Sequence, residues 1–438
     1  MTRNQRYSLL SIRDFRRMFA AYALASFGDW FDALAIQVLV AYRWGADPML
    51  LALIPVTMAL PAVLLGSFAG TVADRVRKAR LMLVCDLITA GLTLCILAAP
   101  HIAWLLPLLA LRAACSVFHV PAQQALTRQV VPPALLFQAT SFNGLVNQSS
   151  KVAGPLLGAM TLTALSPQAC IMLNAGARLL SAALLLPLRS LPVSRRTEAA
   201  GRTEGPRSGA WAAFLQNWRE GWLYLFQAKK VRYTMIFGFV GLTALLMIDY
   251  QFPTLLRTID PVNESLIGWL VSAIGAGAVA VLVVLNRLNR ISYGWGLGGG
   301  YILIGAGIAL LGLCPPGTGV LLLLGLGMMI GIGNGMYMVT QNYILQKETS
   351  EQLIGRVYGI QSTITSLVML VAPLVGGVLI QATRAGVAFL LIGAVTALIG
   401  LAGIALRSAI WGSPAPAPDC NPAVAAGEGA REARRING

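Results

Sequence analysis

The chain has 438 residues, of which 57% are hydrophobic and only 11% are charged. A soluble domain usually has about 45–50% apolar and about 25% charged residues, so most of this surface is not built for water. The net charge of +16 does not indicate nucleic-acid binding, because that function needs basic residues gathered on one soluble face. Here the basic residues lie between apolar runs, which excludes a soluble nucleic-acid-binding protein.

Apolar runs of about 20 residues, long enough to cross a bilayer, recur along the whole chain. They predict an all-helical membrane protein with twelve transmembrane helices, at residues 18–41, 49–72, 80–99, 103–127, 138–163, 169–188, 233–256, 265–285, 294–313, 319–345, 355–380 and 386–409. The first run is too long for a signal peptide and carries Asp29 and Asp32 in its middle, so we expect it to stay in the mature protein.

The basic residues alternate from one side of the predicted membrane to the other. Of the 33 Lys and Arg residues, 27 fall in the termini and in the loops after every second helix, three fall in the opposite loops and three fall inside helices. Loops rich in Lys and Arg stay in the cytoplasm. The sequence therefore predicts that both termini are cytoplasmic.

The longest interruption, residues 189–232, divides the chain into two sets of six helices. It is Arg-rich at first and then carries aromatic residues and leucines on a helical period. This pattern indicates either an amphipathic helix on the membrane surface or a soluble helix packed under the bundle. We expect an N-terminal bundle at 1–188, this connector, a C-terminal bundle at 233–410 and a disordered tail at 411–438, which has too few apolar residues to fold.

The two sets of helices share local patterns. The Gly154–Gly158 segment of the fifth helix recurs as Ala372–Gly376 in the eleventh, and at the same spacing His119 falls on Tyr337. The basic segment after the second helix has a weaker echo after the eighth. These matches predict that the halves arose by duplication, as parallel repeats do in many secondary transporters.

The segment after the second helix reads Gly70-Thr-Val-Ala-Asp74-Arg75-Val-Arg77-Lys78-Ala79-Arg80. It resembles the loop signature of the major facilitator superfamily, with an Arg at position 77 where a Gly is usual, and the resemblance covers the chain from about Arg13 to Arg407. In that family the Asp accepts hydrogen bonds from the positive N-terminal end of the eleventh helix and latches the two halves together. The gate implied by the resemblance comprises Gly70, Asp74, Arg75, Lys78, Arg80 and Arg356. A basic loop that only fixes topology is the alternative, but it does not explain the Gly and the Asp.

The fifth helix carries small residues at the spacing of the superfamily's exporter-associated motif. They are Ser141, Ser150, Gly154, Pro155 and Gly158, with Ser in place of two glycines. Small residues let helix backbones approach closely, so packing alone is the alternative explanation. The resemblance favours export, and the regions around Ser26–Asp29 and Asp74 are similar to the bacterial subgroup of enterobactin exporters and macrolide efflux pumps.

Charged side chains at the bilayer centre cost roughly 3 kcal/mol each, so we expect those inside helices to be paired or hydrated. The count is Asp29, Asp32 and Asp249 against Arg112, Lys151 and Arg178, and the balance predicts that these groups meet around a polar cavity. Asp29 and Asp32 share one helix face, and Arg112 resembles the arginine that proton-coupled exporters carry in the fourth helix.

These interior charges suggest a coupling hypothesis, in which Asp29 or Asp32 pairs with Arg112 or Lys151 when ionised and releases it when protonated. A static ion pair that only orients the helices is the alternative. Asp249 is either a further coupling candidate or an entrance charge paired with Arg257, and the sequence assigns no role to Arg178.

Polar residues on helical stripes are the candidates for the substrate cavity, since helices 1, 4, 7 and 10 line the cavity in the superfamily. They are His119, Gln123, Asn143, Asn147, Asn334, Tyr337, Gln341 and Gln361. His119 is either a proton carrier or a hydrogen-bonding contact to substrate or to a neighbouring helix.

The sequence contains no nucleotide-binding loop, metal-ligand cluster or nucleophile arrangement, so we expect no enzyme activity, no cofactor and no metal. It predicts a monomeric, proton-coupled exporter of a small amphiphilic molecule, such as a siderophore or an antibiotic, in the bacterial inner membrane. Its expected partners are the substrate, protons and the lipid bilayer. The alternatives are a nutrient or lysolipid transporter of the same fold and a membrane sensor that transports nothing.

Overall fold

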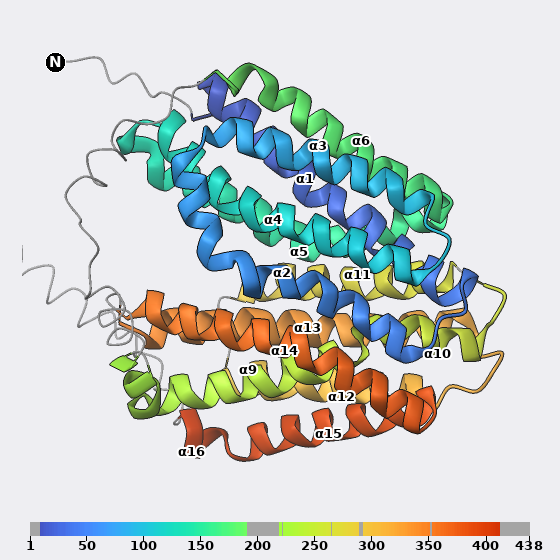
Figure 1. The fold of residues 1–438 in the computed structure, drawn as a ribbon. Helices are drawn as coiled ribbons and strands as arrows, with labels where there is room; N and C mark the ends of the chain where they lie inside the picture. The colour runs from blue at the N-terminus through green and yellow to red at the C-terminus, as the bar shows by residue number, and fades with distance from the viewer. Residues whose placement is uncertain are drawn as a thin grey trace, which may run out of the picture.

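The computed structural model describes residues 9–190, 219–220, 222–263, 265–288, 292–350 and 353–411. Throughout this part the chain is helical, without β-strands (Figure 1). The long helices of the first half are α1 (Arg13–Val38), α2 (Pro48–Arg75), α3 (Lys78–Leu97), α4 (Ile102–Val130), α5 (Leu136–Ala164) and α6 (Pro167–Leu185). Those of the second half are α9 (Lys229–Ile248), α10 (Phe252–Ile259), α11 (Leu266–Leu288), α12 (Gly300–Gly312), α13 (Val320–Glu348), α14 (Ile354–Ala382), α15 (Ala385–Ala405) and the short α16 (Arg407–Trp411).

The apolar character of these helices fits the width of a bilayer. Within the described ranges, eleven helical segments are long and apolar enough to cross a membrane, and α5 adds a shorter apolar stretch at Ala153–Ala164. Their positions follow the twelve predicted runs, so the prediction of an all-helical membrane protein is confirmed. The sidedness of the termini stays a prediction.

The predicted seventh span, 233–256, is confirmed within the apolar segment Lys229–Ile259, but that segment is not one continuous α-helix. The chain instead forms α9, a 3₁₀ turn at Asp249–Gln251 and then α10. Pro253 lies at the start of α10 and explains the break, because a proline has no N–H to donate and its ring collides with the carbonyl four residues earlier, here that of Asp249. Asp249 therefore lies at the discontinuity rather than inside a helix.

The two halves pack by the same plan. In the first, α5 packs on α1 and α4 packs on α2 and α3; in the second, α14 packs on α9 and α13 packs on α11 and α12. The glycines of the repeated motif make equivalent contacts, since Gly158 meets the backbone of Trp30 in α1 and Gly376 meets that of Met247 in α9. A side chain at either position would collide with that backbone. The two sets of helices lie side by side in Figure 1, and the exact domain boundaries stay predictions.

The halves meet through α2 against α14 and α5 against α11. Gly377 of α14 lies against Pro48 and Ala52 of α2, and Gly268 of α11 lies against Ala159 of α5. These residues are at the ends of their helices that are farther from the connector. Two hydrogen bonds cross between the halves at the same end. The Gln251 side chain donates to the Pro48 carbonyl (2.8 Å), and Arg257 donates to the Ala41 carbonyl (2.7 Å).

Toward the connector end, three glycines of the same helices have open space where a side chain would lie. Gly66 of α2, Gly144 of α5 and Gly359 of α14 have no neighbouring atom within 4 Å of that place. Phe68, beyond Gly66 on α2, is 63% exposed. The contacts between the halves that are described above therefore lie at the end of Pro48 and Gly377, which we call the closed end.

The described part of the connector packs under the second half. Leu225 is buried with Val231 and Met235 of α9 and with Val357 of α14. The aromatic positions from Trp211 to Trp218, on which the amphipathic-helix prediction also depends, lie outside the described residues. At the other end of this half the folded part includes Trp411, which is buried and donates from Nε1 to Thr234 Oγ1 (3.1 Å), and the rest of the predicted tail also lies outside the described residues.

Candidate functional site

A close interior ion pair joins α1 to α4. Arg112 Nη1 lies 2.6 Å from Asp32 Oδ2, and the Asp32 side chain is only 2% exposed. The second terminal nitrogen of Arg112 lies 3.9 Å from Asp29 Oδ1. The structure thus brings together three of the residues that the coupling hypothesis names.

Arg178 of α6, to which the sequence assigned no role, makes the largest set of charged contacts. Its Nη2 donates to both carboxylate oxygens of Asp29, at 2.7 and 2.6 Å, and its Nη1 donates to Asp86 Oδ1 of α3 at 2.9 Å. The count of interior charges from the sequence is wrong, because it omits Asp86. An acidic residue inside the apolar run 80–99 was the signal that could have found it.

Asp86 is fully buried and has three polar neighbours. Besides Arg178, the Ser181 hydroxyl lies 2.6 Å from its Oδ2, and His119 Nε2 of α4 lies 3.5 Å from its Oδ1. The Ser181 hydroxyl is also 3.0 Å from the Ala21 carbonyl of α1. These contacts tie α3 to α4 and α6, and α6 to α1.

Together these groups form one network, the interior charge cluster, composed of Asp29, Asp32, Asp86, Arg112, His119 and Arg178. It spans α1, α3, α4 and α6. Within it Asp29 differs from the other carboxylates, since its side chain is 43% exposed whereas those of Asp32 and Asp86 are 2% and 0% exposed. The cluster therefore joins one carboxylate with an exposed side chain to carboxylates that are buried.

Asp249 is not part of this cluster. It is exposed, and the structure gives it no ion pair among the described residues. The predicted pairing with Arg257 is wrong, because Arg257 donates to the Ala41 carbonyl of the other half. The side chain of Lys151, another coupling candidate, lies outside the described part of the structure.

The predicted cavity residues divide into two groups. Four of them, His119, Gln123, Tyr337 and Gln341, are buried. Tyr337 donates to the Gly238 carbonyl of α9 (3.2 Å) and stacks on Tyr301 of α12, so it bridges helices of its own half. In this conformation these buried residues contribute to packing within each half.

The other four cavity candidates are accessible to solvent: Asn143, Asn147, Asn334 and Gln361. Asn143 donates to Thr127 Oγ1 (3.0 Å), and Asn147 donates to the Tyr22 hydroxyl of α1 (3.4 Å). Their assignment to a substrate cavity stays a prediction, since the structure holds no substrate.

The predicted gate is only partly described. The surroundings of Gly70 and the side chains of Asp74, Arg75 and Arg356 lie outside the described part of the structure. Lys78 is buried at the start of α3, whereas Arg80 is exposed. The latch between the second and eleventh predicted helices therefore stays a prediction.

A second cluster of polar residues lies at the connector end of the second half. Glu348, the last residue of α13, accepts hydrogen bonds from Lys230 Nζ (3.1 Å) and the Tyr293 hydroxyl (3.0 Å), and its carbonyl accepts one from the Tyr224 hydroxyl (3.1 Å). Burial and the hydrogen bond to Glu348 raise the pKa of Tyr293. These contacts tie the connector to α9, α13 and the chain preceding α12.

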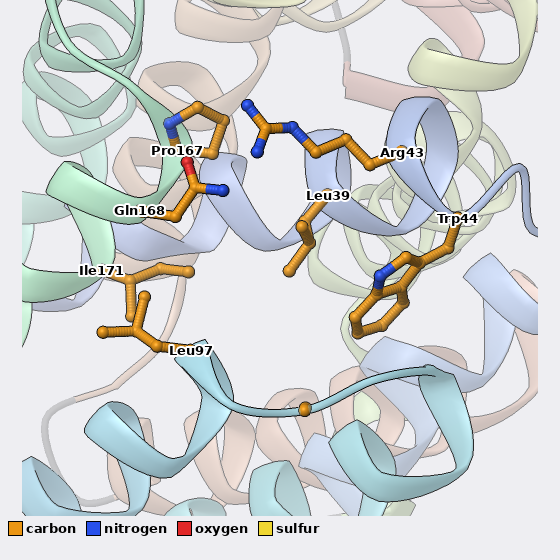
Figure 2. Close-up of a pocket in the computed structure, with 8 residues that line it drawn as sticks. Leu39, Arg43, Trp44, Leu97, Pro167, Gln168 and Ile171 are labelled. Atoms are coloured by element: carbon orange, nitrogen blue, oxygen red, sulfur yellow. The ribbon is translucent and has the colours of Figure 1, made fainter.

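A cavity of about 250 Å³ lies at the opposite end of the first half. Figure 2 shows its lining, which includes Arg43, Trp44 and Gln168, and which is completed by Leu39, Leu97, Ala99, Pro167 and Ile171. None of the residues of the interior charge cluster lines this cavity. It is therefore separate from the ionisable groups described above.

Comparisons with known proteins agree on one family. The sequence profile of the Major Facilitator Superfamily matches residues 18–260 and 260–436. The MFS-type transporter YfiS of Bacillus subtilis (strain 168) is 27% identical over 396 residues, which cover 88% of this chain and 91% of YfiS. Macrolide efflux protein A of Enterococcus faecalis is 21% identical over 321 residues, covering 71% of this chain and 94% of that protein.

Solved structures show the same fold at low sequence identity. The nucleoside transporter NupG superposes with a TM-score of 0.64 at 14% identity, over 92% of this chain and 100% of NupG. A bacterial homologue of the human lysosomal transporter Spinster, in an inward-facing and unoccupied conformation, gives a TM-score of 0.62 at 13% identity, over 91% and 96% of the two chains. The chain belongs to the Major Facilitator Superfamily and is a multi-pass membrane transporter, not an enzyme.

Proposed function

We propose that this protein is a proton-coupled exporter of small amphiphilic organic molecules, with macrolide-like antibiotics as the first class to test and siderophores as the second. It works as a monomer by alternating access in the bacterial inner membrane. The observation that carries the proposal is the interior charge cluster, in which an accessible carboxylate, Asp29, shares Arg178 and Arg112 with carboxylates that are fully buried.

Such a cluster suits proton coupling for an electrostatic reason. A carboxylate beside a guanidinium stays ionised, and loss of the guanidinium or of solvent favours its protonation. Asp29 lies 2.6 Å from Arg178 and is open to solvent, so a proton can reach it. Protonation weakens its hold on both arginines and changes the charge that a substrate meets.

The direction of transport rests on three supports. The helix 5 motif resembles that of exporters, the relatives include macrolide efflux protein A, and the positive charge pattern predicts cytoplasmic termini. With that sidedness, the contacts of Gly377 with Pro48 and of Gly268 with Ala159 lie on the outer side of the membrane.

Transport into inverted membrane vesicles tests this function. Vesicles from an efflux-deficient bacterium that expresses the protein are acidified inside, and accumulation of a radiolabelled macrolide is measured with and without a protonophore. We expect uphill accumulation that the protonophore abolishes. Asp29→Asn and Asp32→Asn should each lower it at least tenfold and leave downhill exchange intact, whereas Asp47→Asn, at an exposed position, should behave like wild type.

The other outcomes separate the rival functions. Uphill accumulation that survives in both cluster variants rules out coupling at these carboxylates. Uptake into intact cells in place of export indicates a nutrient or lysolipid transporter. Purified protein in proteoliposomes that moves neither a macrolide nor a siderophore, under any gradient, supports a sensor that transports nothing.

A further inference from the structure

Asp86 is the deepest member of the interior charge cluster, and the coupling scheme above does not use it. Its side chain is 0% exposed, and its one guanidinium partner, Arg178, is also bound to both oxygens of Asp29. One positive charge therefore serves two carboxylates. The nearest other guanidinium, that of Arg112, lies closest to Asp32 at 2.6 Å.

The charges of the cluster do not cancel. Its described side chains comprise three carboxylates and two guanidiniums, which leaves one negative charge in excess. An uncompensated charge inside a protein costs several kcal/mol, and water cannot relieve it at Asp86. When Arg178 is engaged by Asp29, Asp86 needs one more positive charge or one bound proton, because its own side chain is 0% exposed.

His119 is the side chain placed to supply that proton. Its Nε2 lies 3.5 Å from Asp86 Oδ1 and has no hydrogen-bond partner, and the side chain is 7% exposed. Histidine is the residue that changes charge near neutral pH. The other groups around Asp86 are Arg178 and Ser181 from α6 and the thiol of the adjacent Cys85, and none of these supplies a proton-dependent positive charge.

The second half has no such pair in the equivalent contact. Where α3 meets α4 through Asp86 and His119, α12 meets α13 through the rings of Tyr301 and Tyr337, whose centroids are 5.1 Å apart. Both tyrosines donate to backbone carbonyls of α9. Among the described residues, the ionisable version of this contact belongs to the first half.

We propose that Asp86 and His119 together hold one proton and form a second protonation site, separate from Asp29 and Asp32. Its role in transport rests on the proposed proton-coupled function. When the proton is bound, the imidazolium balances Asp86 and leaves Arg178 to Asp29. When the proton leaves, Asp86 draws Arg178 toward itself and Asp29 is released. The protonation state of the Asp86–His119 pair thereby determines whether Arg178 is bound to Asp29, the exposed carboxylate of the cluster.

The chain offers a direct measurement, because it contains only two histidines, His101 and His119. Purified protein labelled with ¹⁵N-histidine should give two sets of imidazole resonances. His101 is exposed, and in His101→Gln the imidazole signals that remain are those of His119. At pH 7.5 an unperturbed imidazole is about 90% neutral, and we expect His119 to show the shifts of the doubly protonated ring.

Removal of the carboxylate tests the partnership. In Asp86→Asn the His119 shifts should become those of the neutral ring, while Asp47→Asn should leave them unchanged. A neutral His119 in the wild type at pH 7.5 overturns the proposal, and this measurement needs no variant of the cluster to fold. A His119 that stays charged in folded Asp86→Asn overturns it as well.

Vesicle transport then tests the functional part. In His119→Gln, uphill macrolide accumulation should lose its dependence on external pH and fall at least tenfold, with downhill exchange kept, whereas His101→Gln should match wild type. If the wild type accumulates neither a macrolide nor a siderophore, the proposed function fails and the NMR result stands alone. If the wild type accumulates macrolide and His119→Gln has the same pH profile, the second protonation site is refuted and the proposed function survives.

Discussion

Arg178→Gln should destabilise the protein more than any exposed substitution, because Arg178 neutralises a carboxylate that water cannot reach. The variant removes one hydrogen bond to Asp86 and two to Asp29. Asp29 can be hydrated in compensation, since its side chain is 43% exposed. Asp86 cannot, and it keeps only the more distant His119 at 3.5 Å, so most of the effect comes from that one buried carboxylate.

The magnitude follows from measured cases. Removing one partner of a buried ion pair costs about 3–5 kcal/mol. With an unfolding entropy of about 2.1 cal/mol/K per residue, a chain of this length loses about 1 °C of melting temperature per kcal/mol. We therefore expect the melting temperature of the detergent-solubilised protein to fall by roughly 4 °C.

A double-mutant cycle identifies the cause. The melting temperatures of wild type, Arg178→Gln, Asp86→Asn and the double variant are measured by intrinsic tryptophan fluorescence, with the exposed Arg189→Gln as the matched control. The double variant should recover most of the stability, because it leaves no unpaired charge at Asp86. The reasoning is refuted if Arg178→Gln melts within 1 °C of wild type, or if the double variant is as unstable as the sum of the two single variants.

Two further predictions concern the packing of the helices. Gly376→Leu should lower the melting temperature by about 1–3 °C, through roughly 1–3 kcal/mol of overpacking against α9. Gly359→Leu, on the same helix but with nothing within 4 Å, should not. Equal effects of the two substitutions would contradict the close contact of Gly376 with α9. Arg257→Ala removes a charged hydrogen bond between the halves, worth about 1.5–3 kcal/mol. It should speed alkylation of a cysteine placed at the buried Ala52 at least tenfold. The matched control is Arg384→Ala, at an exposed position. An unchanged labelling rate in Arg257→Ala, or an equal increase in Arg384→Ala, would argue that this hydrogen bond does not hold the two halves together.

Hydropathy predicted the fold well because the bilayer imposes a single rule on every spanning segment. It placed the seventh span correctly but not the interruption within it, because it read only apolar content between 233 and 256. Pro253 lies at that interruption, yet a proline alone does not predict one, since prolines such as Pro107 and Pro155 lie inside unbroken helices elsewhere in the chain.

Only part of the candidate site could be predicted from the sequence. Asp32 and Arg112 stood out because each is a charge in the middle of an apolar run. Asp86 lies only eight residues beyond Lys78, close to a basic loop, where an acidic residue looks like a surface group. The role of Arg178 could not be predicted, because its partners lie on α1 and α3, and only the packing of three helices brings them to one place.

The position of the charges determines which parts of the molecule can move. Arg178 binds α1 and α3 from α6, and Arg112 binds α1 from α4. Separating these four helices would therefore leave the buried carboxylates of Asp32 and Asp86 without their guanidinium partners. The helices α2, α5, α11 and α14 meet across the halves through glycines such as Gly268 and Gly377, whose dispersion contacts are individually weak. Opening the closed end should thus be a sliding of apolar surfaces around a rigid, ionically cross-linked core, with the exchange of partners at Arg178 confined to side-chain movements inside that core.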